Sequence, residues 1–230
     1  MTKKKTKVAL DELKLEFGLD NIPKRIECYD ISHIQGSNVV ASMSVFENGI
    51  PKKSDYRRFK ISEDKNDDFE AMREVINRRF NRLIDKKKTV STKLDSFNKR
   101  PDLVLIDGGK GQLSSALQSL DNLGISDIPV AGIAKREEEI FLPYTEDSII
   151  LDKSSQGLYL IQRIRDEAHR FAITYHRNIR GKKSNKSRLD NIEGIGSVKR
   201  KALLRKFKSV ENIKNASPEE ISQIKYININ

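Results

Sequence analysis

The sequence predicts an α/β protein in which helices flank a mixed sheet, followed by a small all-α domain. Strand-like runs occur first as a cluster and then singly, between segments of helical periodicity. A basic segment containing Ser and Asn follows the last long helical period, and a Gly-x-Gly turn then opens a second helical region. We expect four parts: a basic tail and helix at 1–20, a large domain at 21–180, a linker at 181–188 and a small helical domain at 189–230.

Each element is predicted from its apolar period and its end signals. Asn48-Gly49 supplies hairpin turn chemistry between two strands. The apolar run 103–106 is typical of a strand buried on both faces. A helical apolar stripe begins at Phe69, and glycines at 18 and 124 end two helices. The predicted order is a basic tail and helix within 3–20, strands at 25–32, 39–46 and 54–61, a helix at 67–83, a loop at 86–100, a strand at 103–106, a helix ending at 124, a strand at 128–134, an outer hairpin of 139–143 and 148–152, and a long helix from 154 to about 180.

This order of elements is that of the ribonuclease-H-like fold. Three strands form an antiparallel meander, and helices then alternate with further strands. A helical crossover makes the later strands parallel to the first strand. In such a sheet the strands at 25–32 and 103–106 are neighbours.

The composition indicates a polyanionic partner and a reducing environment. The 230-residue chain has a formal net charge of +11, and phosphate contacts by Lys and Arg release counterions. A ribosome-associated or merely lysine-rich protein is the alternative. Cys28 is the only cysteine and is expected to be buried. No apolar run is long enough to span a bilayer or resembles a signal peptide, so we expect a cytoplasmic protein without membrane contact. One cysteine and three scattered histidines disfavour zinc.

Two aspartates are the strongest candidates for catalysis. Asp30 lies inside a strand, where an acid is unfavourable unless something pairs with it. Asp107 follows the buried strand and precedes two glycines. If the strands are neighbours, the two carboxylates meet, and a cation between them would relieve their repulsion. Mg²⁺ or Mn²⁺ suits oxygen ligands and can activate water for hydrolysis. A hydrogen-bonded strand residue at 30 and a capping residue at 107 are the alternatives.

Three further residues could belong to the same site. His169 lies one position from the apolar side of the long helix, so it could face the carboxylates and bind metal or move protons. Taken alone, it would more often be a surface histidine. Asp68 is a further acidic candidate, although the dipole of the helix that it begins is a sufficient reason for an acid there. His33 could support the site or shape the end of its strand.

Several basic residues and glycines are expected to contact a DNA backbone. The run around Lys110 lacks the spacing of an ATP-binding loop, but its amides and ammonium can contact a phosphate. Arg57 and Arg58 are expected to help position the backbone. In the small domain, a Gly-x-Gly hairpin opens a basic helix, a combination that grips phosphates without reading bases; a plain turn is the alternative. The hairpin residues in question are Gly194, Gly196, Lys199, Arg200 and Lys201.

Five motifs in sequence order resemble the C-terminal half of the UvrC family, the incision subunit of bacterial nucleotide excision repair. The resemblance covers about 25–221. It implies a ribonuclease-H-like endonuclease domain followed by tandem helix-hairpin-helix motifs, and an incision on the 5′ side of a DNA lesion with UvrB, in the pathway that includes UvrA. It also implies that Asp30, Asp107 and His169 form a catalytic triad and that Asp68 is a further important acid. The motifs are Glu27–His33, Tyr56–Phe59, Asp67–Met72, Leu105–Gln112 and Arg165–Ala172.

The chain departs from that family pattern in two ways. The family's N-terminal half, with its GIY-YIG nuclease for the 3′ cut and its UvrB-binding segment, is not found in this sequence. A second Gly-x-Gly turn is also not found before Asn230, so we expect an incomplete second hairpin and weakened duplex binding.

The sequence therefore predicts a metal-dependent DNA endonuclease. Two other classes stay open. The chain could be a non-catalytic DNA-binding module whose acids are structural, or a different ribonuclease-H-like enzyme, such as a junction resolvase or ribonuclease H.

Overall fold

The computed structural model describes residues 2–34, 38–62, 67–85, 95–134, 138–190, 192 and 194–224. The chain divides into two compact units, Met1–Ile173 and Thr174–Asn230. No helix in these described ranges is both long enough and apolar enough to cross a membrane.

The first unit is built on one mixed sheet with the strand order β3-β2-β1-β5-β6-β7-β8, and β4 also pairs with β2. Strand β1 is antiparallel to β2 and parallel to β5, and β5 is parallel to β6. The predicted meander and the predicted parallel crossovers are both present. The strands are β1 Arg25–Ile34, β2 Asn38–Glu47, β3 Ile50–Pro51, β4 Arg57–Lys60, β5 Leu103–Ile106, β6 Val130–Ile133, β7 Ile140–Phe141 and β8 Ser148–Ile149.

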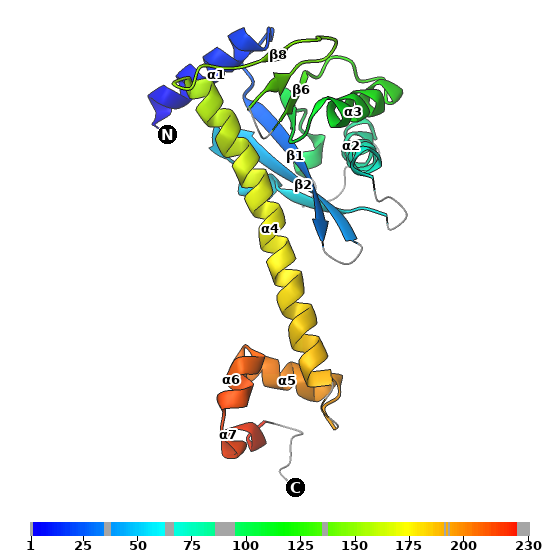
Figure 1. The fold of residues 1–230 in the computed structure, drawn as a ribbon, viewed down its shortest axis with the longest axis vertical. Helices are drawn as coiled ribbons and strands as arrows, with labels where there is room; N and C mark the ends of the chain where they lie inside the picture. Colours follow the sequence, from blue (N-terminus) through cyan, green and yellow to red (C-terminus); the bar gives the residue numbers. More distant parts are fainter. Residues whose placement is uncertain are drawn as a thin grey trace. The chain divides into compact units, whose positions relative to one another are not determined.

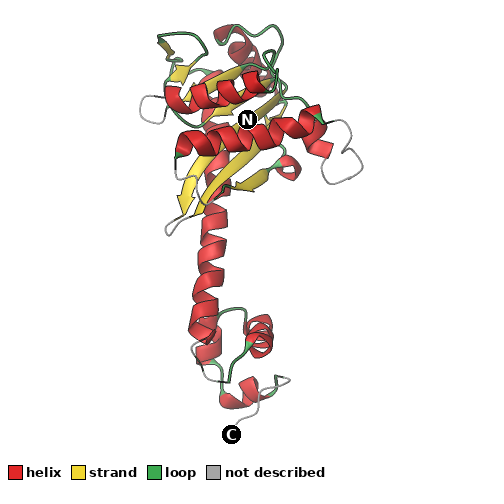
Figure 2. Cartoon of the chain, turned by 90° about the vertical axis from the view of Figure 1, so that its right-hand side faces the viewer, coloured by secondary structure: helices red, strands yellow, loops and turns green. Residues whose placement is uncertain are grey.

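Helices cover both faces of this sheet (Figures 1 and 2). Side chains of β1 alternate between two cores: Ile26 and Cys28 face α1 and α4, whereas Tyr29 faces α2 and α3. The same alternation on β5 places Leu105 with the first core and Ile106 with the second. The helices are α1 Lys3–Glu16, α2 Asp68–Ile84, α3 Lys110–Asn122 and α4 Gln156–Asp190.

The structure corrects four element predictions. The basic tail is the first turn of α1, because the Thr2 side chain caps a helix that already starts at Lys3. The strand predicted at 54–61 is shorter, because β4 begins only at Arg57; a 3-10 turn, Lys53–Asp55, takes its first residues, and the short β3 precedes that turn. In the predicted loop 86–100, residues 86–94 lie outside the described ranges, and Asp95–Asn98 forms a 3-10 turn that buries Phe97.

The fourth correction concerns the predicted linker at 181–188, which the structure assigns to α4. Four of its eight residues are Lys or Arg, which have good helix propensity. The single glycine and the Ser and Asn residues are therefore not sufficient to end the helix.

The apolar stripe of α2 is buried as predicted at Met72, Ile76 and Phe80, but its first predicted residue is not buried and an arginine joins it. Phe69 is 43% exposed, whereas Arg79 is completely buried. The Arg79 guanidinium donates two hydrogen bonds to the Glu27 carboxylate, from Nε to Oε2 at 3.1 Å and from Nη2 to Oε1 at 2.8 Å. Burial lowers the pKa of Arg79, but the nearby Glu27 carboxylate raises it and leaves it above its ordinary value. The need to neutralise a buried carboxylate therefore places an arginine in a core position.

The second unit is all-α, as predicted. Beyond the end of α4, it contains α5 Ser197–Phe207, α6 Val210–Asn215 and α7 Pro218–Ser222. Lys206 Nζ donates to the Glu220 carbonyl at 2.8 Å and so connects α5 to α7.

Candidate active site

The ends of β1 and β5 place Asp30 and Asp107 next to each other. The parallel register pairs Tyr29 with Ile106, and the Asp107 amide donates to the Tyr29 carbonyl at 2.8 Å. One residue further along each strand, Asp30 and Asp107 therefore stand side by side on the face that α4 covers. Asp30 is 1% exposed and Asp107 is 5% exposed. The prediction that neighbouring strands bring the two acids together is correct in this structure.

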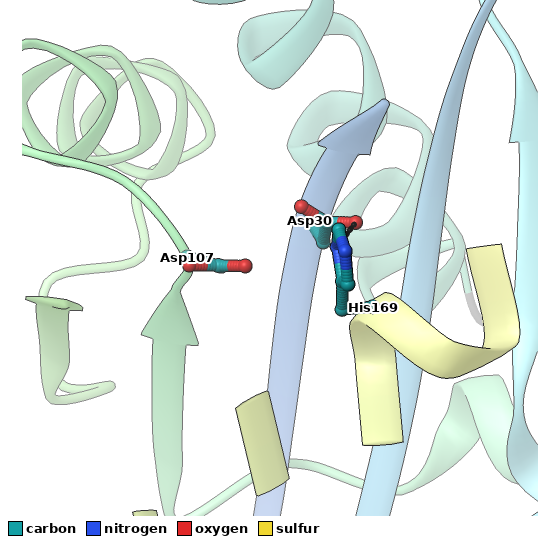
Figure 3. A group of neighbouring side chains, drawn as sticks. All are labelled: Asp30, Asp107 and His169. Atoms are coloured by element: carbon teal, nitrogen blue, oxygen red, sulfur yellow. Dashed lines mark ion pairs between the residues drawn. The ribbon is translucent and has the colours of Figure 1, made fainter. Parts of the chain in front are cut away.

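Helix α4 brings His169 over the two carboxylates. Two serines of β2 hold the helix on the sheet: Ser42 Oγ donates to the Ala168 carbonyl at 3.1 Å, and Ser44 Oγ donates to the Ile164 carbonyl at 3.3 Å. His169 Nδ1 lies 3.7 Å from Asp30 Oδ2. Figure 3 shows Asp107 pointing from the end of β5 toward Asp30, and His169 reaching the pair from α4.

The three side chains have the chemistry and spacing of a metal site. Each offers one ligand atom, and these atoms all lie within 4.8 Å of one another. Ser32 Oγ also donates to Asp30 Oδ2 at 2.8 Å, which orients that carboxylate. Two buried carboxylates at this separation repel unless a proton or a cation lies between them. Oxygen ligands with one imidazole fit a hard or borderline divalent cation, so the residues present fit Mg²⁺ or Mn²⁺.

Arg58 lies in the same row of the sheet as the site. The register pairs Arg58 of β4 with Ser42 of β2, and Ser42 with Asp30 of β1. The Arg58 guanidinium lies 3.7 Å from the centre of the Phe171 ring, and its Nη2 donates to the Phe171 carbonyl at 3.0 Å. The Arg58 backbone therefore lies about 10 Å from that of Asp30, since neighbouring strands are about 4.8 Å apart, and Phe171 holds the guanidinium charge in place.

A second group of side chains, absent from the sequence predictions as functional residues, supports Phe171. The Tyr56 ring contacts the Phe171 ring edge-on with centroids 5.2 Å apart, and the Tyr56 hydroxyl donates to Glu167 Oε1 at 3.2 Å. Hydrogen bonds from Arg170 lower the pKa of Glu167. Burial, reinforced by Glu167, raises the pKa of Tyr56. Tyr56 and Phe171 do belong to family-like motifs, but nothing in their spacing indicates that they meet.

Asp68 does not join the three-residue cluster among the described residues. Its Oδ1 lies 2.5 Å from His33 Nε2, and its Oδ2 accepts a hydrogen bond from Gln112 Nε2 at 3.1 Å. His33 therefore contacts Asp68 rather than Asp30. The catalytic importance predicted for Asp68 stays a prediction.

Two of the predicted phosphate contacts are engaged elsewhere in this structure. Arg57 Nη1 donates to the carbonyls of Ser54 and Tyr56, both at 2.8 Å. Lys110 Nζ donates to the Glu146 carbonyl at 2.6 Å. A DNA contact by either residue would have to compete with these bonds.

The Gly-x-Gly hairpin in the second unit has the predicted local geometry. Gly194 has φ +80°, a conformation that favours glycine, and Gly196 is the N-cap of α5. A Cβ built at Gly196 meets no atom within 4 Å, so the backbone there is open to a ligand. The first turns of α5 carry the three basic residues Lys199, Arg200 and Lys201, and no acid lies in its first turn.

Comparison with known proteins assigns the chain to a family. Residues 14–173 match the family described as the UvrC RNase H endonuclease domain. The chain belongs to the UvrC RNase H endonuclease domain family. The predicted ribonuclease-H-like fold and the predicted family are thus confirmed. Residues 186–229 match the SAM-like helix-hairpin-helix tandem family; that the second hairpin is incomplete stays a prediction.

Individual relatives carry the same family name. UvrABC system protein C of Streptomyces avermitilis is 46% identical over 233 residues, covering 94% of this chain and 34% of the relative. The protein of the same name from Dehalococcoides mccartyi strain BAV1 is 51% identical over 221 residues, covering 96% and 36%. The chain thus spans about a third of the length of these UvrC relatives. The crystal structure of human ENDOV aligns with a TM-score of 0.37 and 15% identity over 59% of this chain and 60% of that one.

Proposed function

We propose that the chain is a divalent-metal-dependent endonuclease that makes the 5′ incision beside a DNA lesion in nucleotide excision repair. We include UvrB and UvrA as partners in this proposal. The convergence of Asp30, Asp107 and His169 at the shared end of β1 and β5 is the observation that carries it. Membership of a nuclease family gives this geometry its chemical context.

The two aspartates would hold Mg²⁺ or Mn²⁺. When bound, such a cation lowers the pKa of a coordinated water and stabilises negative charge on the phosphate. Asp30 is oriented for this role by the Ser32 hydroxyl. Both carboxylates are buried at the ends of strands, so their positions are restricted by the surrounding structure.

His169 differs from the aspartates because half of its side chain is exposed. It can therefore contact both the buried Asp30 carboxylate and a phosphodiester that arrives from solvent. Its ring can bind the cation or move a proton at the scissile bond. Arg58, fixed against Phe171, would orient the DNA strand through one phosphate.

The decisive assay supplies the N-terminal half found in relatives, together with UvrA and UvrB, and measures nicking of a lesion-bearing duplex. Asp30→Asn and Asp107→Asn keep the shape of the side chains and remove their charge. We expect 5′ nicking to be lost and 3′ nicking to continue. Asp152→Asn, at an exposed acid outside the site, is the matched control. Unchanged 5′ nicking in both site variants would overturn the proposal.

Calorimetry separates this proposal from a non-catalytic DNA-binding module. Titration of Mn²⁺ into the chain should give binding heat that disappears in Asp30→Asn and persists in Asp152→Asn. A module whose acids are structural predicts no binding that depends on Asp30. Parallel assays with junction and RNA–DNA hybrid substrates separate the proposal from a resolvase or ribonuclease H.

A further inference from the structure

A hollow of about 580 Å³ opens at the same end of the central sheet as the candidate metal site. It lies on the other face, because His33 follows Asp30 by three residues and strand side chains alternate. Its wall comes from the ends of three elements: β1, α2 and α3. The lining includes His33, Asp68, Phe69, Gly109, Gly111 and Gln112.

One wall of the hollow is an aromatic ring. Phe69 has the helical spacing of a core residue, yet it is 43% exposed. Its ring rests directly on the first turn of α3, where a Cβ built on Gly111 would lie 2.5 Å from Phe69 Cε1. Only a glycine at 111 lets the ring lie this close. The result is an exposed aromatic surface held in a fixed position.

The rest of the lining is polar and held together by hydrogen bonds. Asp68 accepts from Gln112 at one oxygen and lies 2.5 Å from the His33 ring at the other. The Gln112 side chain also covers Gly108, since a Cβ built there would lie 1.8 Å from Gln112 Oε1. Asp67, at the rim, caps α2 by accepting from the Phe69 amide at 3.1 Å.

The chemistry of these walls disfavours both a phosphate and a cation. None of the described lining residues is Lys or Arg, and two are aspartates. Lys110, in the same turn, is directed to the Glu146 carbonyl. A cation is also a poor occupant, because both Asp68 oxygens already have partners and Asp67 serves as a cap. Within the described ranges, the only group with metal-site spacing is the triad.

A flat group with hydrogen-bonding edges fits these walls. Unstacked nucleobases are recognised by stacking on an aromatic ring and by hydrogen bonds to their edges. We propose that this hollow takes one unpaired base of the DNA strand that is being cut. Phe69 stacks on the base, and His33 and Gln112, which Asp68 holds in place, contact its edge. This proposal rests on the proposed function, since it assumes a DNA strand at the triad.

The distance between the two sites suits this role. His33 follows Asp30 on the same strand, so their Cα atoms are about 10 Å apart. One strand of a duplex rises about 3.4 Å per nucleotide and an unpaired strand is more extended, so the hollow lies at most about three nucleotides from the metal site. Asp107, Gly108 and Gly109 also connect the two sites through consecutive residues. A base in the hollow would fix which phosphate reaches the triad.

Fluorescence of 2-aminopurine tests the proposal. The full chain, without divalent metal, is mixed with a hairpin duplex that ends in a short single-stranded stretch, and 2-aminopurine is moved along that stretch. We expect a fluorescence change at one position, because the probe base leaves the stack with its neighbours and stacks on Phe69. Phe69→Leu keeps the bulk but removes the ring and should abolish this change, whereas Phe69→Tyr should still give a change at the same position. Tyr144→Ala, which removes a 92%-exposed ring elsewhere, is the matched control.

An abasic residue at that position provides a second measurement. Removing the base should weaken binding to the wild type by about 5- to 150-fold, the usual contribution of one stacked base. The same removal should have little effect in Phe69→Leu. Equal weakening in both proteins, or no position-specific fluorescence change up to the highest protein concentration, overturns the proposal. Neither measurement needs metal or cleavage. A failure of base binding in the hollow can therefore be distinguished from a failure of the proposed cleavage at the triad.

Discussion

Two buried acids of β1, three residues apart, have opposite kinds of partners. Glu27 is completely buried on the face covered by α2 and α3, and its carboxylate accepts hydrogen bonds from Arg25, Arg79 and the Tyr29 hydroxyl. Asp30 is 1% exposed on the face covered by α4, beside a second acid. In the described part of the chain, no Lys or Arg forms an ion pair with Asp30.

The difference distinguishes a structural acid from a functional one. Two guanidinium groups neutralise Glu27 permanently, and the ion pair with Arg79 connects β1 to α2. Asp30 is contacted by the neutral Ser32 hydroxyl and by a half-exposed histidine, so its charge is left for an added ligand. Burial alone therefore does not identify a site; the partners of the buried acid do.

The largest expected effect is on cleavage by the Asp107→Asn variant. We expect 5′ nicking to fall by about 10³- to 10⁴-fold, because a metal ion contributes several kcal/mol to transition-state stabilisation at about 1.4 kcal/mol per tenfold. Single-turnover nicking rates at saturating Mn²⁺ measure this loss. A loss under tenfold would mean that Asp107 is as structural as Glu27.

The next effect is on the free energy of unfolding. Removing the charge of Glu27 should lower it, whereas removing the charge of Asp30 should not. Glu27→Gln should lower the free energy of unfolding by about 3 kcal/mol, because it leaves the buried Arg79 charge uncompensated. Asp30→Asn should leave stability unchanged or higher without metal, because it removes repulsion from Asp107. Urea unfolding of both variants at neutral pH measures the difference. Equal destabilisation by the two substitutions would contradict the comparison.

The strands that position the site could be predicted from the sequence. The side-chain contacts between separate elements could not. The apolar run 103–106 ends directly before Asp107, and the order of elements makes this strand the parallel neighbour of β1, so Asp107 could be placed beside Asp30. Arg79 was not recognisable as a core residue, because its burial depends on Glu27, fifty-two residues earlier in the chain. The contact of Asp68 with His33 and Gln112 likewise depends on how α2 and α3 meet.

A smaller effect is expected at alkaline pH through Tyr29. Burial, followed by the nearby Glu27 carboxylate, raises the pKa of Tyr29 well above its ordinary value. Tyr29 therefore contributes stability that is fully present below the unfolded pKa of about 10 and is lost as pH rises further. The loss should approach about 1.4 kcal/mol per pH unit above pH 10 for this one proton. Urea unfolding between pH 8 and 11 should show a shallower decline in Tyr29→Phe; an unchanged decline would contradict this account.

The smallest expected effect concerns the two serines that hold α4 on the sheet. Ser42→Ala and Ser44→Ala each remove one buried hydrogen bond to an α4 carbonyl, so each should lower stability by about 1 kcal/mol. Only Ser42 contacts Ala168, the residue before His169, so only Ser42→Ala should also slow nicking, by less than about tenfold. Thermal unfolding and nicking rates of the two variants are the measurements. Because the stability changes are matched, a rate loss confined to Ser42→Ala would show that the position of His169 matters. Equal nicking rates in the two variants would show that the reaction tolerates small movements of His169 on α4.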